Sequence, residues 1–91
     1  MNINTPLPVI HINGTSRETL VAEYQAALDA VREGRAALAK VTVNGRDYYP
    51  IGPNALDAAI AEHRRHQRAL HDVAEHLGNV LWHLTDLEAA R

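Results

Sequence analysis

The sequence predicts a mainly α-helical fold in which two helices form a long antiparallel hairpin. Three observations support this prediction. Apolar residues recur at alternating steps of three and four over two long segments, a Gly- and Pro-rich island separates those segments, and the one other patterned run is short and β-prone. Ninety-one residues make a single domain, 1–91, which we divide into 1–14 (extended arm with a short strand), 15–40 (first helix), 41–53 (loop) and 54–88 (second helix).

The N-terminal arm contains a short β-prone segment, Val9 to Asn13. A single strand cannot stand alone, so this segment either pairs with another strand or lies against the helices. Helix signals follow immediately, because Ser16 with Thr19, or Thr15 with Glu18 as a capping box, can cap a helix start.

The first helix has an apolar stripe of Leu20, Tyr24, Leu28, Val31 and Leu38. Arg35 interrupts this stripe, and Gly34 beside it is typical of close packing against a neighbouring helix. For the connection that follows, two readings stay open. Asn44-Gly45 can turn a small two-stranded ribbon, or the helix can run to about Val43 with Gly45 just beyond its end; we favour a helix that ends near Lys40 and an irregular or β-hairpin loop.

The second helix is expected to begin with Asn54 as N-cap, and its seam alternates steps of four and three as in a coiled coil. The seam residues are Leu56, Ile60, His63, Gln67, Leu70, Ala74, Leu77, Leu81 and Leu84. Val73, Val80 and Leu87 add a second stripe, so the C-terminal half should contact more than one neighbour.

If the two helices pair antiparallel from the loop, the N-terminal end of the first helix would lie opposite about Leu77 of the second. The later turns then need another cover, for which we expect both residues 9–12 and a second subunit. We therefore predict a homo-oligomer formed through residues 9–12, Leu77, Leu81, Trp82 and Leu84. The alanine-dominated apolar fraction and the absence of Phe support assembly, because such a small chain buries little area alone.

Composition limits the function classes. A formal charge of −2 argues against indiscriminate nucleic-acid binding. The chain has no cysteine and no window of about 20 apolar residues, and its first residues do not resemble a secretion signal. We expect a cytoplasmic protein without membrane contact.

The loop is the first candidate binding site. Tyr48 and Tyr49 are adjacent and should point to opposite sides, so that one packs inward and the other faces a ligand. Arg46 could hold phosphate or carboxylate, while Asp47 and Asn44 could meet ribose hydroxyls. The alternative is structural: Asp47 caps a turn or pairs with Arg46, and both tyrosines plug the end of the bundle.

The second candidate is a histidine–arginine surface on the second helix. His63, Arg64, Gln67 and Arg68 could bind an anion together with the loop, or form only a solvated basic face. His63 with His66, and His71 with Glu75, have metal-ligand spacings, but nothing closes a zinc site and the arginines would oppose a cation. No serine or cysteine lies in a nucleophile motif, so we predict no enzyme, no cofactor and no metal.

The runs Asn13-Gly14-Thr15-Ser16-Arg17-Glu18 and Asn44-Gly45-Arg46-Asp47-Tyr48-Tyr49-Pro50-x-Gly52, with the helix that follows, resemble small phage and prophage proteins without assigned function. The resemblance covers about residues 11–75 and implies an accessory gene product. Proteins of that kind include inhibitors of host defence, some of which are oligomeric sponges that withhold a nucleotide-derived immune signal.

Three functions follow as hypotheses. The first is a non-enzymatic sponge for a small anionic nucleotide-type ligand, such as a cyclic nucleotide or an ADP-ribose derivative. The second is a protein-interaction module that inhibits a host defence protein, which predicts an exposed apolar patch at Leu81, Trp82 and Leu84. The third, a DNA-binding regulator, has the least support from the net charge.

Overall fold

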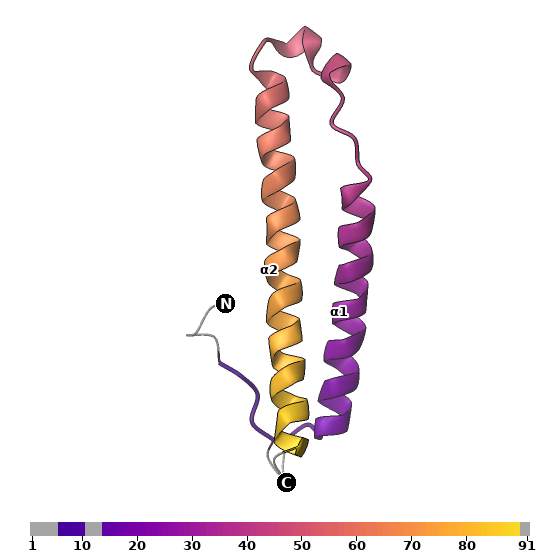
Figure 1. The fold of residues 1–91 in the computed structure, drawn as a ribbon, viewed down its shortest axis with the longest axis vertical. Coiled ribbons are helices and arrows are strands. Elements are labelled where there is room, and N and C mark those ends of the chain that lie inside the picture. The colour runs from indigo at the N-terminus through magenta and orange to yellow at the C-terminus, as the bar shows by residue number, and fades with distance from the viewer. Residues whose placement is uncertain (1–5, 11–13, 90–91) are drawn as a thin grey trace.

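The computed structural model, which describes residues 6–10 and 14–89, is an antiparallel pair of long helices (Figure 1). Helix α1 (Arg17–Ala39) and helix α2 (Ala55–Ala89) pack against each other. Two 3-10 turns, η1 (Gly45–Asp47) and η2 (Tyr49–Ile51), lie in the connection. The described residues contain no strand. The prediction of a mainly α-helical hairpin is therefore confirmed.

Ser16 is the N-cap of α1. Its Oγ accepts a hydrogen bond from the Thr19 backbone N–H at 3.2 Å and donates one to Thr19 Oγ1 at 2.9 Å. The structure thus shows the Ser16–Thr19 cap rather than the alternative capping box. The helix ends at Ala39, after which the Lys40 N–H turns back to the Ala37 carbonyl at 3.1 Å.

The connection contains no β-ribbon. Asn44 Oδ1 instead accepts a hydrogen bond from the Arg46 N–H at 3.0 Å, and the Asn44 carbonyl accepts one from the Asp47 N–H at 3.1 Å. A two-residue hairpin of the Asn-Gly type needs positive φ at both central residues. Among the residues that the structure describes, only Gly52 has a positive φ, at 133°, so Asn44-Gly45 starts a 3-10 turn.

The two turns sit over the beginning of α2. A Cβ added to Gly45 would lie 3.3 Å from Leu56 Cδ2, so the backbone of η1 approaches the first turn of α2 closely. Gly52 precedes α2 in a backbone conformation that other residues rarely adopt. The Asn54 carbonyl then accepts a hydrogen bond from the Ala58 N–H at 3.1 Å, which places Asn54 at the expected N-cap position.

Helix α1 lies beside the middle and C-terminal turns of α2, and the connection lies beside its first turns (Figure 1). Leu38 and Ala39 line one hollow with Gln67, while Arg17 lines another with Thr85. The expectation that the N-terminal end of the first helix lies opposite about Leu77 is wrong. That expectation assumed that the two helices contact each other directly from the loop. In the structure, the extended residues 41–44 and the two turns lie beside the first turns of α2 instead.

The N-terminal arm passes beside the last turns of α2 (Figure 1), where His83 Nε2 lies 2.9 Å from the Pro8 carbonyl oxygen. Val9 is 82% exposed and belongs to no strand; His11 to Asn13 of the expected strand lie outside the described residues. Leu84 is buried within the single chain, so it cannot belong to the subunit interface or to the exposed patch that the sequence predicted. Leu81 is half-buried, and Trp82 remains 72% exposed.

The core is small. The buried apolar residues within the described part of the chain are Leu28, Ala74, Val80 and Leu84. Leu28 and Ala74 lie together between α1 and α2, while Val80 and Leu84 belong to the turns of α2 around His83, which contacts the arm. The molecule is a rod of 61 × 24 × 22 Å. Neither of its helices has an apolar stretch long enough to span a membrane.

Candidate anion-binding groove

Two adjoining hollows run along one side of the helix pair. One has a volume of about 330 Å³ and is lined by Arg32, Arg35, Ala36, Leu38, Ala39 and Gln67. The other has a volume of about 320 Å³ and is lined by Leu28, Arg32, Arg35, His71, Ala74 and Glu75. Because both hollows share the same two arginines of α1, we treat them as one site and name it the arginine groove.

Arg32 and Arg35 come from successive turns of α1 and are both exposed. Neither guanidinium has an ion pair or hydrogen bond with another residue of the described chain. Each guanidinium presents five N–H donors in a planar fork that matches carboxylate and phosphate oxygens. Two such groups without a carboxylate partner at one hollow form a site whose chemistry favours an anion.

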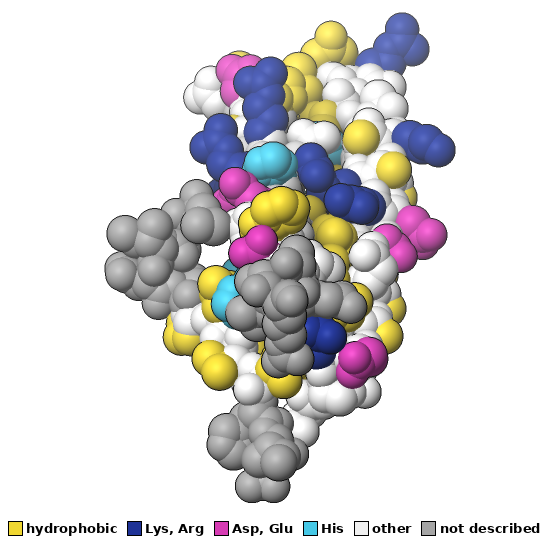
Figure 2. Space-filling view, turned by 60° about the horizontal axis from the view of Figure 1, so that its bottom comes forward, with side chains coloured by type: hydrophobic (Ala, Val, Ile, Leu, Met, Phe, Trp, Pro, Cys, Tyr) yellow, Lys and Arg dark blue, Asp and Glu magenta, His cyan; other side chains and the backbone are white. Residues whose placement is uncertain are grey.

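Helix α2 supplies the opposite wall. Gln67 is half-buried, and its amide offers one acceptor and two donors. In the hollow of about 320 Å³, His71 Nε2 lies 3.8 Å from Glu75 Oε2. The spacing of Arg64 and Arg68 places them on the same side of α2 as His71, and both are exposed. Figure 2 shows basic side chains gathered on one part of the surface beside a histidine.

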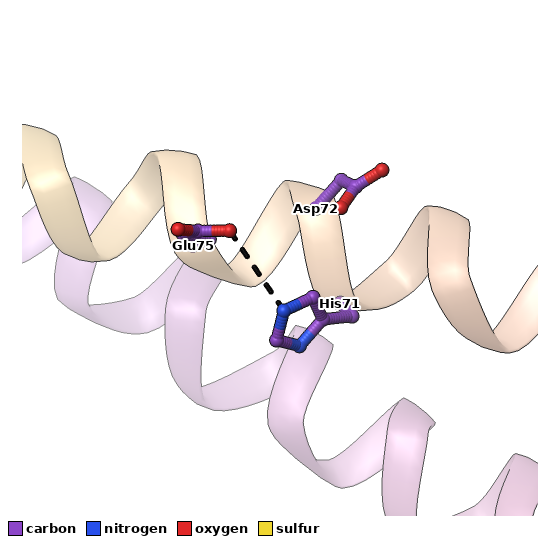
Figure 3. A group of neighbouring side chains, drawn as sticks. All are labelled: His71, Asp72 and Glu75. Carbon is purple, nitrogen blue, oxygen red and sulfur yellow. Dashed lines mark ion pairs between the residues drawn. The ribbon is translucent and has the colours of Figure 1, made fainter. Parts of the chain in front are cut away.

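His71, Asp72 and Glu75 form a cluster whose ligand atoms lie within 4.8 Å of one another (Figure 3). All three are exposed, and Figure 3 shows His71 and Glu75 facing each other along α2. The arginines of the groove line the same hollow as His71 and Glu75 and would repel a cation. The groove therefore suits an anion better than a metal ion.

Glu62 is the centre of a separate network on α2. It forms an ion pair with Arg65, and its Oε1 lies 2.9 Å from His66 Nε2. The hydrogen bond from the Arg65 side chain is the main cause that lowers the pKa of Glu62 and raises that of Arg65. His66 and Arg65 are thus engaged with a carboxylate.

The structure divides the predicted loop residues. Tyr48 is half-buried and Tyr49 is 77% exposed. Arg46 and Asp47 are exposed, and Arg46 forms no ion pair with Asp47. Asn44 is engaged in capping η1.

The loop and the arginine groove are distinct places in one chain. The loop sits over Leu56, and eleven residues of helix, about 17 Å, separate Leu56 from Gln67. Of the predicted site residues, the structure brings Gln67, and by helical spacing Arg64, together with the groove. Half-buried His63 lies between the groove and the loop.

Arg32, Arg35 and His71 are not among the site residues that the sequence predicts. A signal for the arginines was present, because Arg35 occupies a position of the apolar stripe of α1 and Arg32 lies one turn before it. What the pattern lacked was the register of α1 on α2, which decides that these arginines face Gln67 and His71.

The chain matches no family model, no curated protein and no solved structure.

Proposed function

We propose that this chain is a non-enzymatic binding protein that sequesters a small anionic ligand of the nucleotide-derived class. The observation that supports this proposal is the pair of guanidiniums, Arg32 and Arg35, that share one groove without a carboxylate partner in the described chain. Each hollow is at the lower end of the size range of ligand sites, about 300–1,000 Å³.

In this proposal the two arginines hold phosphate oxygens, and the Gln67 amide fixes the orientation of the ligand. An aromatic surface for a base lies on the same side of α2, because Trp82 is seven residues beyond Glu75 and is 72% exposed. Gly78 lies between them with nothing within 4 Å of the position of a Cβ, which leaves room along this side.

The loop resemblance implies a phage-type accessory protein, and such a protein could use this binding to withhold a signal of the host defence. A protein that withholds a nucleotide-derived signal needs affinity without turnover, and it gains capacity as a homo-oligomer with one groove in each chain. The loop residues Asn44, Arg46, Asp47, Tyr48 and Tyr49 provide a second position where such a ligand could be held.

A thermal-shift and calorimetry panel of nucleotides, cyclic nucleotides and ADP-ribose derivatives tests the proposal. Ligand bound only to the native state raises the unfolding midpoint. Loss of one charge-assisted hydrogen bond weakens binding by about tenfold to a hundredfold. We therefore expect Arg32→Ala and Arg35→Ala each to weaken binding by this factor, and the affinity to fall with added salt.

Arg46→Ala is the matched control, because Arg46 is also exposed and unpaired in the described chain but lies in the loop. Binding that survives Arg46→Ala and fails in Arg32→Ala assigns the ligand to the groove. The reverse result moves the site to the loop. No binding across the whole panel would refute the proposal.

A protein-interaction function is the second candidate, and the exposure of Trp82 favours it. Exposed tryptophans are enriched among residues that dominate protein–protein binding energy. Trp82 is the sole tryptophan of the chain, so its fluorescence reports directly on a partner. If the chain inhibits a host protein, Trp82→Ala should abolish that interaction, whereas Arg32→Ala and Arg35→Ala should leave it unchanged.

A further inference from the structure

The side of the helix pair opposite the arginine groove carries a continuous apolar row. Leu20, Tyr24 and Ala27 of α1, with the exposed Glu23 at the edge of the row, line a hollow of about 290 Å³ together with Leu77 of α2. On α1, residues that follow these at alternating steps of four and three lie on the same side of the helix. On α2, Val73 and the residues one turn before and after it, Leu70 and Leu77, share that side. The resulting apolar flank consists of Leu20, Tyr24, Ala27, Val31, Gly34 and Leu38 of α1, with Leu70, Val73 and Leu77 of α2.

Within the described part of the chain no member of this flank is buried, since each is exposed or half-buried. The chain as a whole also exposes more surface than its mass warrants. A compact monomer of 10.0 kDa exposes about 5,200 Å², whereas this chain exposes 7036 Å². The surplus of about 1,800 Å² is large enough for each partner of an obligate dimer, in which about 2,000–5,000 Å² is buried in total.

We infer that a second copy of this chain packs on the apolar flank and forms a two-fold symmetric four-helix dimer. The inference concerns only the homo-oligomeric part of the proposed function and does not depend on a ligand. The alternating spacing of the row is that of helices packed as in a coiled coil, where neighbouring helix axes lie about 8–10 Å apart.

The α1 row is complementary to itself when two copies run antiparallel. A two-fold axis at the middle of the row, between Ala27 and Val31, brings Tyr24 of one chain to Gly34 of the other. The ring then occupies the space at Gly34, where nothing lies within 4 Å of the position of a Cβ. The same axis pairs Leu20 with Leu38. A large side chain thus meets a glycine at one level of the row, and two leucines meet at the next.

Helix α2 meets its copy around the same axis. Leu28 and Ala74 line one hollow and therefore lie at the same height along the rod. The middle of the α1 row is thus level with Val73 and Ala74. In the dimer, Val73 lies next to its own copy, and Leu70 meets the copy of Leu77. Val73, 45% exposed in the single chain, becomes buried.

The two glycines of the helix interiors provide a matched test. Gly34 lies on the apolar flank and Gly78 on the opposite side, and neither has an atom within 4 Å of the position of a Cβ. Gly34→Gln and Gly78→Gln both gain helix propensity, and the Cβ of each lies in open space in the single chain. Sedimentation equilibrium over a range of concentrations should show twice the mass of 10.0 kDa for the wild type and for Gly78→Gln.

Gly34→Gln should raise the dimer dissociation constant by at least about tenfold while its circular dichroism stays helical. A monomeric wild type, or equal dimerisation of the two variants, would overturn the inference. These outcomes are separable from the ligand proposal, because the arginine groove lies on the other side and remains open in the dimer.

Cysteine cross-linking tests the position of the two-fold axis, since the natural chain contains no cysteine. A disulfide needs Cα atoms about 4.4–6.8 Å apart. Val73→Cys should form a disulfide-linked dimer under mild oxidation, and Glu75→Cys, exposed on the groove side of the same turn, should not. A dimer that cross-links through Glu75→Cys and not through Val73→Cys would overturn the proposed face.

Discussion

Replacement of Leu84 by alanine tests whether the end of α2 is packed as the structure shows. Leu84 is 0% exposed. Its neighbours in the sequence mark its place, because His83 contacts Pro8 of the N-terminal arm and Thr85 lines a hollow with Arg17 in the first turn of α1. The substitution deletes about three methylene equivalents, which at about 0.8 kcal/mol each amounts to about 2.4 kcal/mol of transfer free energy. The cavity that remains raises the expected cost to about 3–5 kcal/mol.

This loss is a large part of the total, because a chain of 91 residues has an unfolding free energy of about 5–14 kcal/mol. Urea unfolding followed by far-ultraviolet circular dichroism measures the change as a lower midpoint at unchanged slope. All samples need one protein concentration, since the proposed dimer would make the apparent stability concentration-dependent.

Leu7→Ala is the matched control, since it makes the same chemical change at a residue of the arm that is 42% exposed. We expect it to cost less than about 1 kcal/mol. If Leu84→Ala also costs less than about 1 kcal/mol, the last turns of α2 are not anchored, and the core described above is wrong.

Three further predictions concern the helix start, the turn and the exposed ion pair. Ser16→Ala removes the cap on the Thr19 N–H and should cost about 1 kcal/mol; an unchanged urea midpoint would contradict this. Gly52→Ala forces a side chain into a φ of 133° and should cost about 1–3 kcal/mol; a gain in stability would instead show a relaxed turn. The lowered pKa of Glu62 means that its pairing with Arg65 stabilises the native state above the ordinary glutamate range and is lost as pH falls through the lowered pKa. The melting temperature of the wild type should therefore fall more steeply below about pH 5 than that of Glu62→Gln, and parallel curves would exclude a contribution from the pair.

The sequence was sufficient for the local structure. The three-and-four spacing of apolar residues located both helices, and the preference of Ser16 and Asn54 for cap positions located their starts. These features depend on contacts within a few residues. The seam of α2 was also partly right, since Ala74 and Leu84 are buried.

Register and loop geometry could not be read from the same pattern. The stripe of α1 can slide along the longer seam of α2 by a heptad and keep its apolar contacts, so periodicity alone does not decide what Arg35 faces. Asn44-Gly45 satisfies both a hairpin turn and a 3-10 cap, and its packing over Leu56 decides between them. The candidate groove depends on that register, which is why its arginines were missed.

The uneven placement of buried residues has a consequence for motion. Every buried residue in the described part of the chain lies in the part of the rod where α1 or the arm contacts α2, and none lies between positions 41 and 66. Amide protons in the first turns of α2 should therefore exchange with solvent through small openings, while those near Val80 should wait for global unfolding. The loop end can fray and reclose without the hairpin coming apart. A molecule that contacts exposed Tyr49 would meet a segment whose order it can change at little cost to the rest of the fold.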